Sequence, residues 1–431
     1  MLSRNLCTAL RRLRITPARF CTSVAAPDQG NSGCDPLYAG IRATQFVTKP
    51  ALITPEDYAP IPVYRVIDSD GNVLDSTQEP NLSKETLQKC FRDMVTVNAL
   101  DKIMYESQRQ GRISFYMTNF GEEASHIGSA SALSSEDLVW AQYREAGVLL
   151  WRGWTLSQFI DQLYGNCDDE GRGKQMPCHY GSKKLNFVTI SSTLATQIPQ
   201  AVGSAYVLKR KPDNDRVVVV YFGDGAASEG DFHAALNFAA TLECPVIFFV
   251  RNNGYAISTP VREQYRGDGI ASRGTGYGMA VLRVDGTDML AVHNGTKMAR
   301  EYCLKNNKPI ILESMQYRLS HHSTSDDSSA YRPTEELEMW NTTENPINKL
   351  KNYMLKKGWF NEDEENEFIK SIRKQIMAQN QLSEKKQKPD WREMFYDVYD
   401  DLPLNLRKQL KEMEDHVARH KEQYPLKNFK S

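Results

Sequence analysis

An aspartate between two glycines and a later pair of asparagines are the residues of this sequence best suited to hold a metal-bound phosphate. The aspartate is Asp224, flanked by Gly223 and Gly225, and the second asparagine is Asn253. A carboxylate and an amide oxygen suit Mg²⁺, which usually keeps open positions for phosphate oxygens. The glycines let a ligand approach the backbone closely. Either motif alone is more commonly a simple turn, so the elements around them must decide the interpretation.

Each motif follows an apolar run typical of a strand that is buried on both faces. The runs cover residues 217–222 and 245–250, and a helical segment lies between them. A strand, a helix and a strand of this length form a parallel pair with a right-handed crossover. We therefore expect Asp224 and Asn253 at the carboxyl-terminal edge of one sheet, where open α/β sheets bind ligands. No G-x-G-x-x-G follows the first strand, which argues against a dinucleotide-binding fold.

Strands and helices on either side of this unit predict a larger α/β domain. Apolar runs and helical periodicity predict strands at 138–140, 281–284 and 309–316 and helices at 83–110, 122–133 and 288–306. From residue 334 onward the sequence is charged, with sparse apolar stripes at helical spacing. Such stripes are typical of surface helices or of helices that face a partner.

Length and composition exclude several classes of protein. The chain has 431 residues, 40% of them hydrophobic, and a formal net charge of −1. It can bury a substantial core and exceeds a usual single domain. Its charge gives no electrostatic reason to bind nucleic acid or a charged membrane surface, and no apolar run is long enough for a membrane span. Its eight cysteines lack C-x-x-C spacing, which indicates reduced thiols and not a disulfide framework.

The N-terminal region differs from the rest of the chain. Residues 1–26 contain five arginines and no acidic residue. That composition predicts a mitochondrial transit peptide, cleaved soon after Arg19, with a basic disordered tail as the alternative. Residues 27–82 are rich in Pro, Gly, Asp and Thr, and we expect an extended arm there that could pack on a partner.

Several other polar residues stand at positions where ligands bind, although each has a simpler interpretation. Arg144 follows the strand at 138–140; most arginines are solvated, but its fixed fork suits phosphate oxygens there. The hydroxyls and amides of 190–197 precede a small-residue helix and are typical of helix caps. His126 is expected to be a packing histidine. The segment after residue 317 is too polar to pack, so we expect a surface loop.

Five longer stretches join the Gly-Asp-Gly and Asn-Asn motifs in a close resemblance. They are AQYREAG, KQMPCHYG, FVTISSTLATQIPQAVG, EQYRGDGIA and HHSTSDDSSAYR. With them the chain resembles the thiamine diphosphate-dependent 2-oxoacid dehydrogenases, and among these the alpha subunits of the mitochondrial branched-chain enzymes, from about residue 46 onward. The resemblance implies a thiamine diphosphate-binding α/β fold at 83–333, with a mostly parallel sheet and helices on both faces. It also implies a helical C-terminal region at 334–431.

The resemblance also implies roles for individual residues. The Mg²⁺ ligands would be Asp224, Asn253 and Tyr255, and the ligands of a structural K⁺ would be Ser191, Thr193, Thr196 and Gln197. The contacts to thiamine diphosphate would be Tyr143, Arg144, Ser192, Gly225, Ala226, Arg251 and His322. His322 would also be the active-site histidine, and Ser323 the inhibitory phosphorylation site.

Three positions depart from the family pattern. Thr193 stands where the family normally has proline, which leaves the K⁺ site intact only if the ligand is a main-chain carbonyl. Ser320 replaces a usual glycine. Pro333 occupies the place of a second phosphorylatable serine, so no second site is possible there.

The activity implied is the oxidative decarboxylation of branched-chain 2-oxoacids in the mitochondrial matrix, with acyl transfer to lipoyl groups of a transacylase. No glutamate stands out that could activate the cofactor's aminopyrimidine. The resemblance implies that a beta subunit supplies it, so we expect an α₂β₂ assembly that is inactive without beta, regulated by a kinase and a phosphatase. The alternatives are a pyruvate dehydrogenase alpha subunit and a non-catalytic alpha-like subunit.

Overall fold

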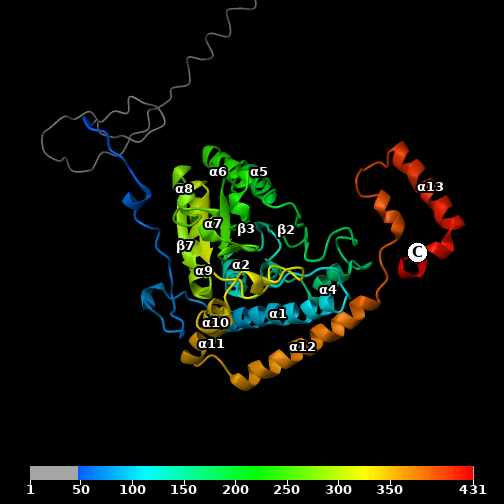
Figure 1. The fold of residues 1–431 in the computed structure, drawn as a ribbon, viewed down its shortest axis with the longest axis horizontal. Coiled ribbons are helices and arrows are strands. Elements are labelled where there is room, and N and C mark those ends of the chain that lie inside the picture. The colour runs from blue at the N-terminus through cyan, green and yellow to red at the C-terminus, as the bar shows by residue number, and fades with distance from the viewer. Residues whose placement is uncertain (1–46, 431) are drawn as a thin grey trace, which may run out of the picture. The chain divides into compact units, whose positions relative to one another are not determined.

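The computed structural model of the protein describes residues 47–430 (Figure 1). The expected transit peptide at 1–26 and the first part of the arm, 27–46, lie outside the described residues. Residues 47–59 belong to one compact unit and contain a short 3₁₀ helix, η2 (Pro55–Asp57). Everything from Pro60 onward forms a second unit, which carries the sheet and all of the predicted site residues.

A six-stranded sheet, in which every neighbouring pair is parallel, organises the second unit. Its order is β2 (Phe187–Val188), β1 (Leu138–Trp140), β3 (Val218–Gly223), β4 (Val246–Asn252), β8 (Ile310–Met315) and β7 (Ala280–Asp285). Val218 pairs with Val246 and Gly223 with Arg251, so β3 and β4 end at the same edge. The expected parallel sheet is confirmed.

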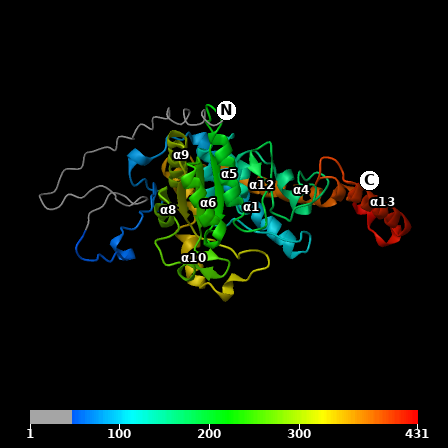
Figure 2. The same ribbon diagram turned by 90° about the horizontal axis from the view of Figure 1, so that it is seen from above.

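Helices cover both faces of this sheet, as expected. They are α1 (Lys84–Arg109), α2 (Glu123–Ala132), α3 (Ala146–Trp151), α4 (Leu156–Tyr164), α5 (Gln197–Lys209), α6 (Gly230–Thr241), α7 (Val261–Gln264), α8 (Ser272–Gly276) and α9 (Met289–Asn306). Helices α5 and α6 lie side by side in Figure 1 and again in the view from above in Figure 2. A small hairpin, β5 (Tyr255–Ala256) and β6 (Thr259–Pro260), follows β4.

Alternate side chains of β3 point into two different cores. Val218, Val220 and Phe222 pack with side chains of α5 and α6, whereas Val219 and Tyr221 pack with side chains of α9. All residues of β3 and β4 are buried. Because both faces are covered, these strands read as continuous apolar runs in the sequence.

The C-terminal region is helical, as expected, and part of it belongs to the core. It contains α10 (Thr334–Thr342), α11 (Pro346–Lys356), α12 (Glu362–Lys385) and α13 (Leu404–Arg419). Helix α12 runs beside α1 (Figure 1), with Arg92 paired to Glu365 at 2.9 Å. Ile376 of α12 is completely buried in the core cluster that contains β3 side chains. No helix of the described residues is long and apolar enough to cross a membrane.

The described part of the arm from Pro60 onward packs on its own chain. Tyr64 forms a parallel bridge beside β7, donating its N–H to the carbonyl of Arg283 at 2.9 Å. Asp288 accepts the main-chain N–H groups of Val66 and Ile67 at 2.7 and 2.8 Å while it caps α9. The arm therefore completes the edge of the sheet next to β7.

Candidate functional site

A cavity of about 610 Å³ lies at the carboxyl-terminal ends of β1, β3 and β4. All ten of the cofactor and Mg²⁺ residues expected from the sequence line it: Tyr143, Arg144, Ser192, Asp224, Gly225, Ala226, Arg251, Asn253, Tyr255 and His322. They come from the segments after β1, β3, β4 and β8 and from the turn before α5. The parallel register brings these segments to one edge, because parallel strands end on the same side.

Asp224 directly follows β3, and one of its carboxylate oxygens has no hydrogen-bond partner. The residue is 2% exposed, and its Oδ1 accepts the N–H of Gly225 at 3.1 Å. Its Oδ2 is buried without a hydrogen-bond partner. Burial raises the pKa of Asp224 to about 6, because a carboxylate is costly to keep charged away from water. A cation at this oxygen would remove that cost.

Asn253 follows β4 with its amide held in one orientation. The side-chain nitrogen donates to Glu122 at 2.8 Å, and the side-chain oxygen accepts the N–H of Tyr255 at 3.3 Å. Among the described residues no three His, Cys, Asp or Glu side chains gather as metal ligands. A metal in this cavity would therefore need amide, main-chain and ligand oxygens in addition to Asp224, which is a set that suits Mg²⁺.

Arg251 ends β4 between two buried carboxylates. Its Nη1 donates to Glu122 at 2.8 Å and its Nε donates to Glu145. Burial alone would raise the pKa of Glu122, but the charges of Arg251 and Arg144 outweigh it and hold that pKa below its ordinary value. The Nη2 of Arg251 is buried without a partner. Two residues that line the cavity thus have a charged group with an unpaired atom, the Arg251 guanidinium and the Asp224 carboxylate. This combination fits a ligand that contains both a phosphate and a metal ion.

His322 reaches the cavity from the segment after β8 and lies against two arginines. Arg144 and Arg318 donate to its Nδ1 at 3.2 and 3.4 Å. Since arginine has no acceptor, Nδ1 must be the unprotonated nitrogen and Nε2 carries the hydrogen. Burial, together with the positive charges of Arg144 and Arg318, lowers the pKa of His322 to about 3. His322 is therefore neutral near pH 7 and presents a donor.

The segment that carries His322 is packed in part, so the expectation that it is too polar to pack was wrong for its buried residues. In contrast, Ser325, Asp327 and Ser329 are exposed as in a surface loop. Arg318 is 1% exposed and donates to the hydroxyl of Tyr331 at 2.9 Å. Asp326 accepts the main-chain N–H of His322 at 2.7 Å and the hydroxyl of Tyr331 at 2.6 Å. The buried polar side chains of this loop bind one another and its backbone, which satisfies their hydrogen bonds without solvent. Composition alone could not reveal that pairing.

Ser323 lies next to His322 and is also buried, with 7% of its surface exposed. Its hydroxyl accepts the N–H of Ser325 at 3.2 Å. The neighbouring Thr324 exchanges hydrogen bonds with the backbone of Tyr116, at 3.1 Å in both directions. An enzyme that modifies Ser323 would therefore have to open this loop first.

Ser192 lies at the turn before α5 and pairs with a histidine that the sequence did not indicate. Its hydroxyl is 2.6 Å from Nε2 of His179, whose Nδ1 lies 3.0 Å from the carbonyl of Pro177. A carbonyl only accepts, so Nδ1 carries the hydrogen and the Ser192 hydroxyl donates to Nε2. His179 also lines the cavity. It belongs to the KQMPCHYG stretch, in which nothing distinguished it from a packing residue.

The four residues expected at a K⁺ site stand apart from the cavity wall. Ser191, Thr193, Thr196 and Gln197 lie in the turn into α5. The Thr196 hydroxyl donates to the carbonyl of Thr193 at 2.9 Å, and the Gln197 amide nitrogen donates to the carbonyl of Tyr221 at 3.1 Å. The main-chain oxygen of Thr193 is thus positioned by the turn and not by its side chain.

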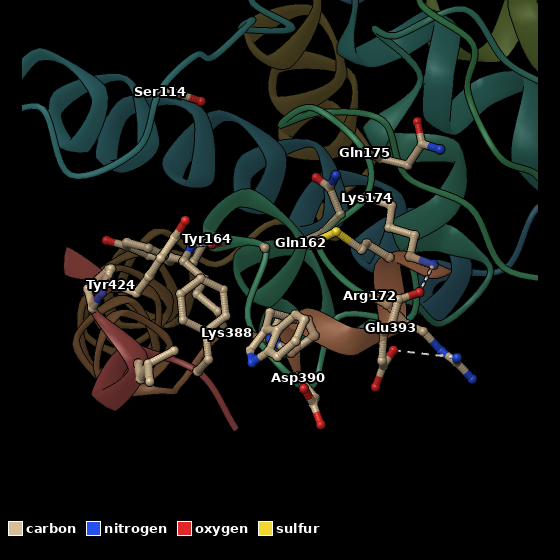
Figure 3. Close-up of a pocket in the computed structure, with 18 of the residues that line it drawn as sticks. Ser114, Gln162, Tyr164, Arg172, Lys174, Gln175, Lys388, Asp390, Glu393 and Tyr424 are labelled. Atoms are coloured by element: carbon tan, nitrogen blue, oxygen red, sulfur yellow. Dashed lines mark hydrogen bonds and ion pairs between the residues drawn. The ribbon is translucent and has the colours of Figure 1, made fainter. Parts of the chain in front are cut away.

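A second cavity, of about 590 Å³, lies between the 162–177 segment and the C-terminal residues after Lys388 (Figure 3). Figure 3 shows Arg172 and Lys174 directed toward the Glu393 segment; the Lys174 ammonium donates to the Glu393 carbonyl at 2.8 Å. None of the predicted site residues lines this cavity. It shares one loop with the first cavity, because Gln175 faces it whereas Met176 and His179 face the first.

Comparison with known proteins places the chain in a family. A model described as "Dehydrogenase E1 component" matches residues 91–392. The chain belongs to the dehydrogenase E1 component family. It is 55% identical over 389 residues to the 2-oxoisovalerate dehydrogenase subunit alpha, mitochondrial, of Caenorhabditis elegans, covering 90% of each chain. Against the Homo sapiens protein of that name the identity is 53% over 394 residues, covering 91% of this chain and 88% of the relative.

A more distant relative extends the match to plants. The chain is 44% identical over 416 residues to 2-oxoisovalerate dehydrogenase subunit alpha 2, mitochondrial, of Arabidopsis thaliana, covering 95% of this chain and 88% of that protein. The resemblance seen in the sequence is therefore confirmed. The cofactor of the E1 family is thiamine diphosphate. Its diphosphate and a metal ion suit the open atoms of Asp224 and Arg251.

Proposed function

We propose that this chain is the alpha subunit of a branched-chain 2-oxoacid dehydrogenase, which oxidatively decarboxylates the 2-oxoacids derived from valine, leucine and isoleucine. The observation that supports it most is the cavity itself. Asp224 and Arg251, each with a charged side-chain atom that lacks a hydrogen-bond partner, line this cavity together with His322. The relatives named 2-oxoisovalerate dehydrogenase subunit alpha share 44–55% of residues with this chain. Their name favours branched-chain acids over pyruvate as substrates.

Asp224, Asn253 and Tyr255 would hold Mg²⁺. Arg144, Arg251, Ser192 and His322, with the backbone of Gly225 and Ala226, would hold the diphosphate, and Tyr143 would contact the cofactor. When bound, thiamine diphosphate would supply the nucleophilic carbon for the 2-oxo group and the electron sink that lets the substrate carboxylate leave as CO₂. The chain's own contribution is to fix the cofactor and to place the neutral His322 beside it. A K⁺ bound by Ser191, Thr193, Thr196 and Gln197 would stabilise the turn before α5.

A beta subunit would complete the active site. Among the described residues, the acidic side chains that line the cavity are Asp224 and Glu229. Asp224 would be committed to Mg²⁺, and Glu229 is exposed at the start of α6. Neither suits the protected carboxylate that activates an aminopyrimidine. We therefore infer an α₂β₂ assembly in the mitochondrial matrix that passes its acyl group to the lipoyl group of a transacylase.

Regulation by a kinase and a phosphatase would act at Ser323. A phosphoserine adds about −1.5 to −2 charge near neutral pH. At a side chain this buried the charge would repel a bound diphosphate and break the Ser325 contact, which would open the loop that carries His322.

Reconstitution with the matching beta subunit tests the proposal. Full decarboxylation is expected only with beta, Mg²⁺ and thiamine diphosphate, with 2-oxoisovalerate preferred over pyruvate and with E229Q as active as the parent. Turnover by the alpha chain alone would refute the shared site, and a preference for pyruvate would refute the substrate. An assembled protein that binds the cofactor but turns over no 2-oxoacid would support the non-catalytic alternative.

A further inference from the structure

Glu122 is a fully buried carboxylate that binds three side chains at the ends of β4 and β8. Its Oε1 accepts from the Asn253 side-chain nitrogen at 2.8 Å. Its Oε2 accepts from Nη1 of Arg251 at 2.8 Å and from the side-chain nitrogen of Gln316 at 2.7 Å. Glu122 precedes α2 and does not line the cavity, so it reaches a ligand there only through its partners.

The charge of Glu122 decides how the Asn253 amide is turned. The two ends of an amide have nearly the same shape, but one donates hydrogen bonds and the other accepts them. An ionised carboxylate only accepts, so the nitrogen end of Asn253 must face Glu122. Arg251 and Gln316 hold Glu122 from the other side and prevent it from turning away. The oxygen end of Asn253 lies on the other side, where it accepts the N–H of Tyr255 at 3.3 Å and keeps a second lone pair for a further partner.

We propose that Glu122 is a positioning residue that keeps the oxygen end of the Asn253 amide turned toward the metal ion. The inference rests on the Mg²⁺ site of the proposed function. A cation needs an oxygen ligand, and an N–H group in that place would repel it. Glu122 thus sets the affinity for Mg²⁺ without touching the ion, as partners of metal ligands commonly do.

Glu313 provides a matched control on the other side of β4. It is also fully buried, and it accepts from the side-chain nitrogen of Asn252 at 2.8 Å and from Nε of Arg283 at 3.0 Å. Neither Glu313 nor Asn252 lines the cofactor cavity. E313Q therefore makes the same chemical change in the same kind of cluster, away from the proposed metal.

The test compares E122Q with E313Q in the assembled α₂β₂ protein. The measurement is the Mg²⁺ concentration that gives half-maximal thiamine diphosphate binding, followed by quenching of tryptophan fluorescence. In E122Q the glutamine oxygen must serve Arg251 and Gln316, so its NH₂ group faces Asn253 and the asparagine amide flips. We expect the Mg²⁺ requirement to rise about 10- to 100-fold. E313Q should lower thermal stability and leave the Mg²⁺ requirement unchanged.

A second pair of variants separates positioning from loss of folding. N253D places two carboxylates within one hydrogen bond of each other, and their repulsion should turn the new carboxylate out of the position of the amide, which weakens Mg²⁺ binding. In the double variant E122Q/N253D the glutamine NH₂ donates to one oxygen of the new carboxylate and leaves the other for the metal. The double variant should therefore bind Mg²⁺ more tightly than N253D.

Two results would overturn the inference: a parental Mg²⁺ requirement in E122Q, or a double variant that binds Mg²⁺ no better than N253D. If E122Q does not assemble, the comparison of N253D with the double variant decides alone. Cofactor binding by the parent without any need for Mg²⁺ would instead refute the metal site of the proposed function.

Discussion

Two buried clusters of the same residue types flank the end of β4, and only one of them faces the cofactor cavity. The cavity cluster consists of Glu122, Glu145, Arg251 and Asn253, and the strand cluster consists of Glu313, Arg283 and Asn252. The ion pairs are similarly buried, with side-chain exposures of 2% and 0% for Arg251 and Glu122 and of 6% and 0% for Arg283 and Glu313. Burial and composition do not distinguish the two.

Hydrogen-bond satisfaction does distinguish them. Glu313 accepts the N–H groups of Ile270 and Ala271 at 2.8 and 3.0 Å in addition to its two side-chain donors, and no buried side-chain atom of the strand cluster lacks a partner. On the cavity side, Nη2 of Arg251 and Oδ2 of the adjacent Asp224 have none. Buried polar groups are rarely left unpaired. Other buried atoms of the described residues also lack a partner, but those of Asp224 and Arg251 are the two whose residues line the cofactor cavity, so here the unpaired atoms fit a ligand site.

Removal of the arginine should cause the largest loss of stability, and the loss should be greater in the cavity cluster than in the strand cluster. R251M leaves Glu122 and Glu145 buried without their cation, which costs about 3–5 kcal/mol when a buried pair is broken. R283M leaves one buried carboxylate that still accepts several N–H groups, so its loss should be smaller. Urea unfolding of the metal-free assembly measures both. Equal losses would contradict the distinction.

Neutralisation of an aspartate at the sheet edge should raise the free energy of unfolding at Asp224 and lower it at Asp285. D224N removes a carboxylate whose pKa is raised by burial, so the metal-free protein at pH 8 should gain up to about 3 kcal/mol, at about 1.4 kcal/mol per pKa unit. It should also lose Mg²⁺-dependent cofactor binding. Asp285 ends β7; burial would raise its pKa, but Lys349 and Arg65 hold it below the ordinary value. D285N should therefore destabilise the protein in the same assay.

Acidification should loosen the cavity side selectively. The pKa of His322 in the folded loop is about 3, below the ordinary value of 6.5, so the folded state binds fewer protons than the open loop between these values. Stability of the loop is complete above pH 6.5 and is lost as the pH falls. Hydrogen exchange of 317–333 should be faster relative to 280–285 at pH 5 than at pH 7.5. H322N should abolish that change, and a change that persists in H322N would assign it to another group.

The strands and long helices of this protein could be predicted closely from its sequence. The runs at 217–222 and 245–250 became β3 and β4, and the helix predicted at 83–110 became α1. Period and burial pattern are local properties, so they are visible in one segment at a time. The two-residue strand β2 and the helix α4 were not predicted, because β2 is too short to show a period and α4 was not separated from the loops around it.

The positions of Asp224 and Asn253 at one sheet edge also followed from the sequence, since a β-α-β unit has only one common hand. Glu122, Glu145 and His179 did not. Two acidic residues at the start of a helix look like ordinary first-turn charges. The role of Glu122 depends on the approach of α2 to the end of β4, and that of Glu145 on the approach of α3, which no local pattern records.

The sequence by itself determined which polar residues follow each strand and the family to which the chain belongs, because contiguous motifs carry both kinds of information. The tertiary structure alone decided which buried charged groups are fully hydrogen-bonded and which keep an atom without a partner. That division arises because a hydrogen bond between Glu122 and Asn253 joins residues far apart in the chain, whose meeting depends on packing of the whole sheet. The atoms left unpaired by that packing, at Asp224 and Arg251, are where the cofactor and its metal are expected to bind.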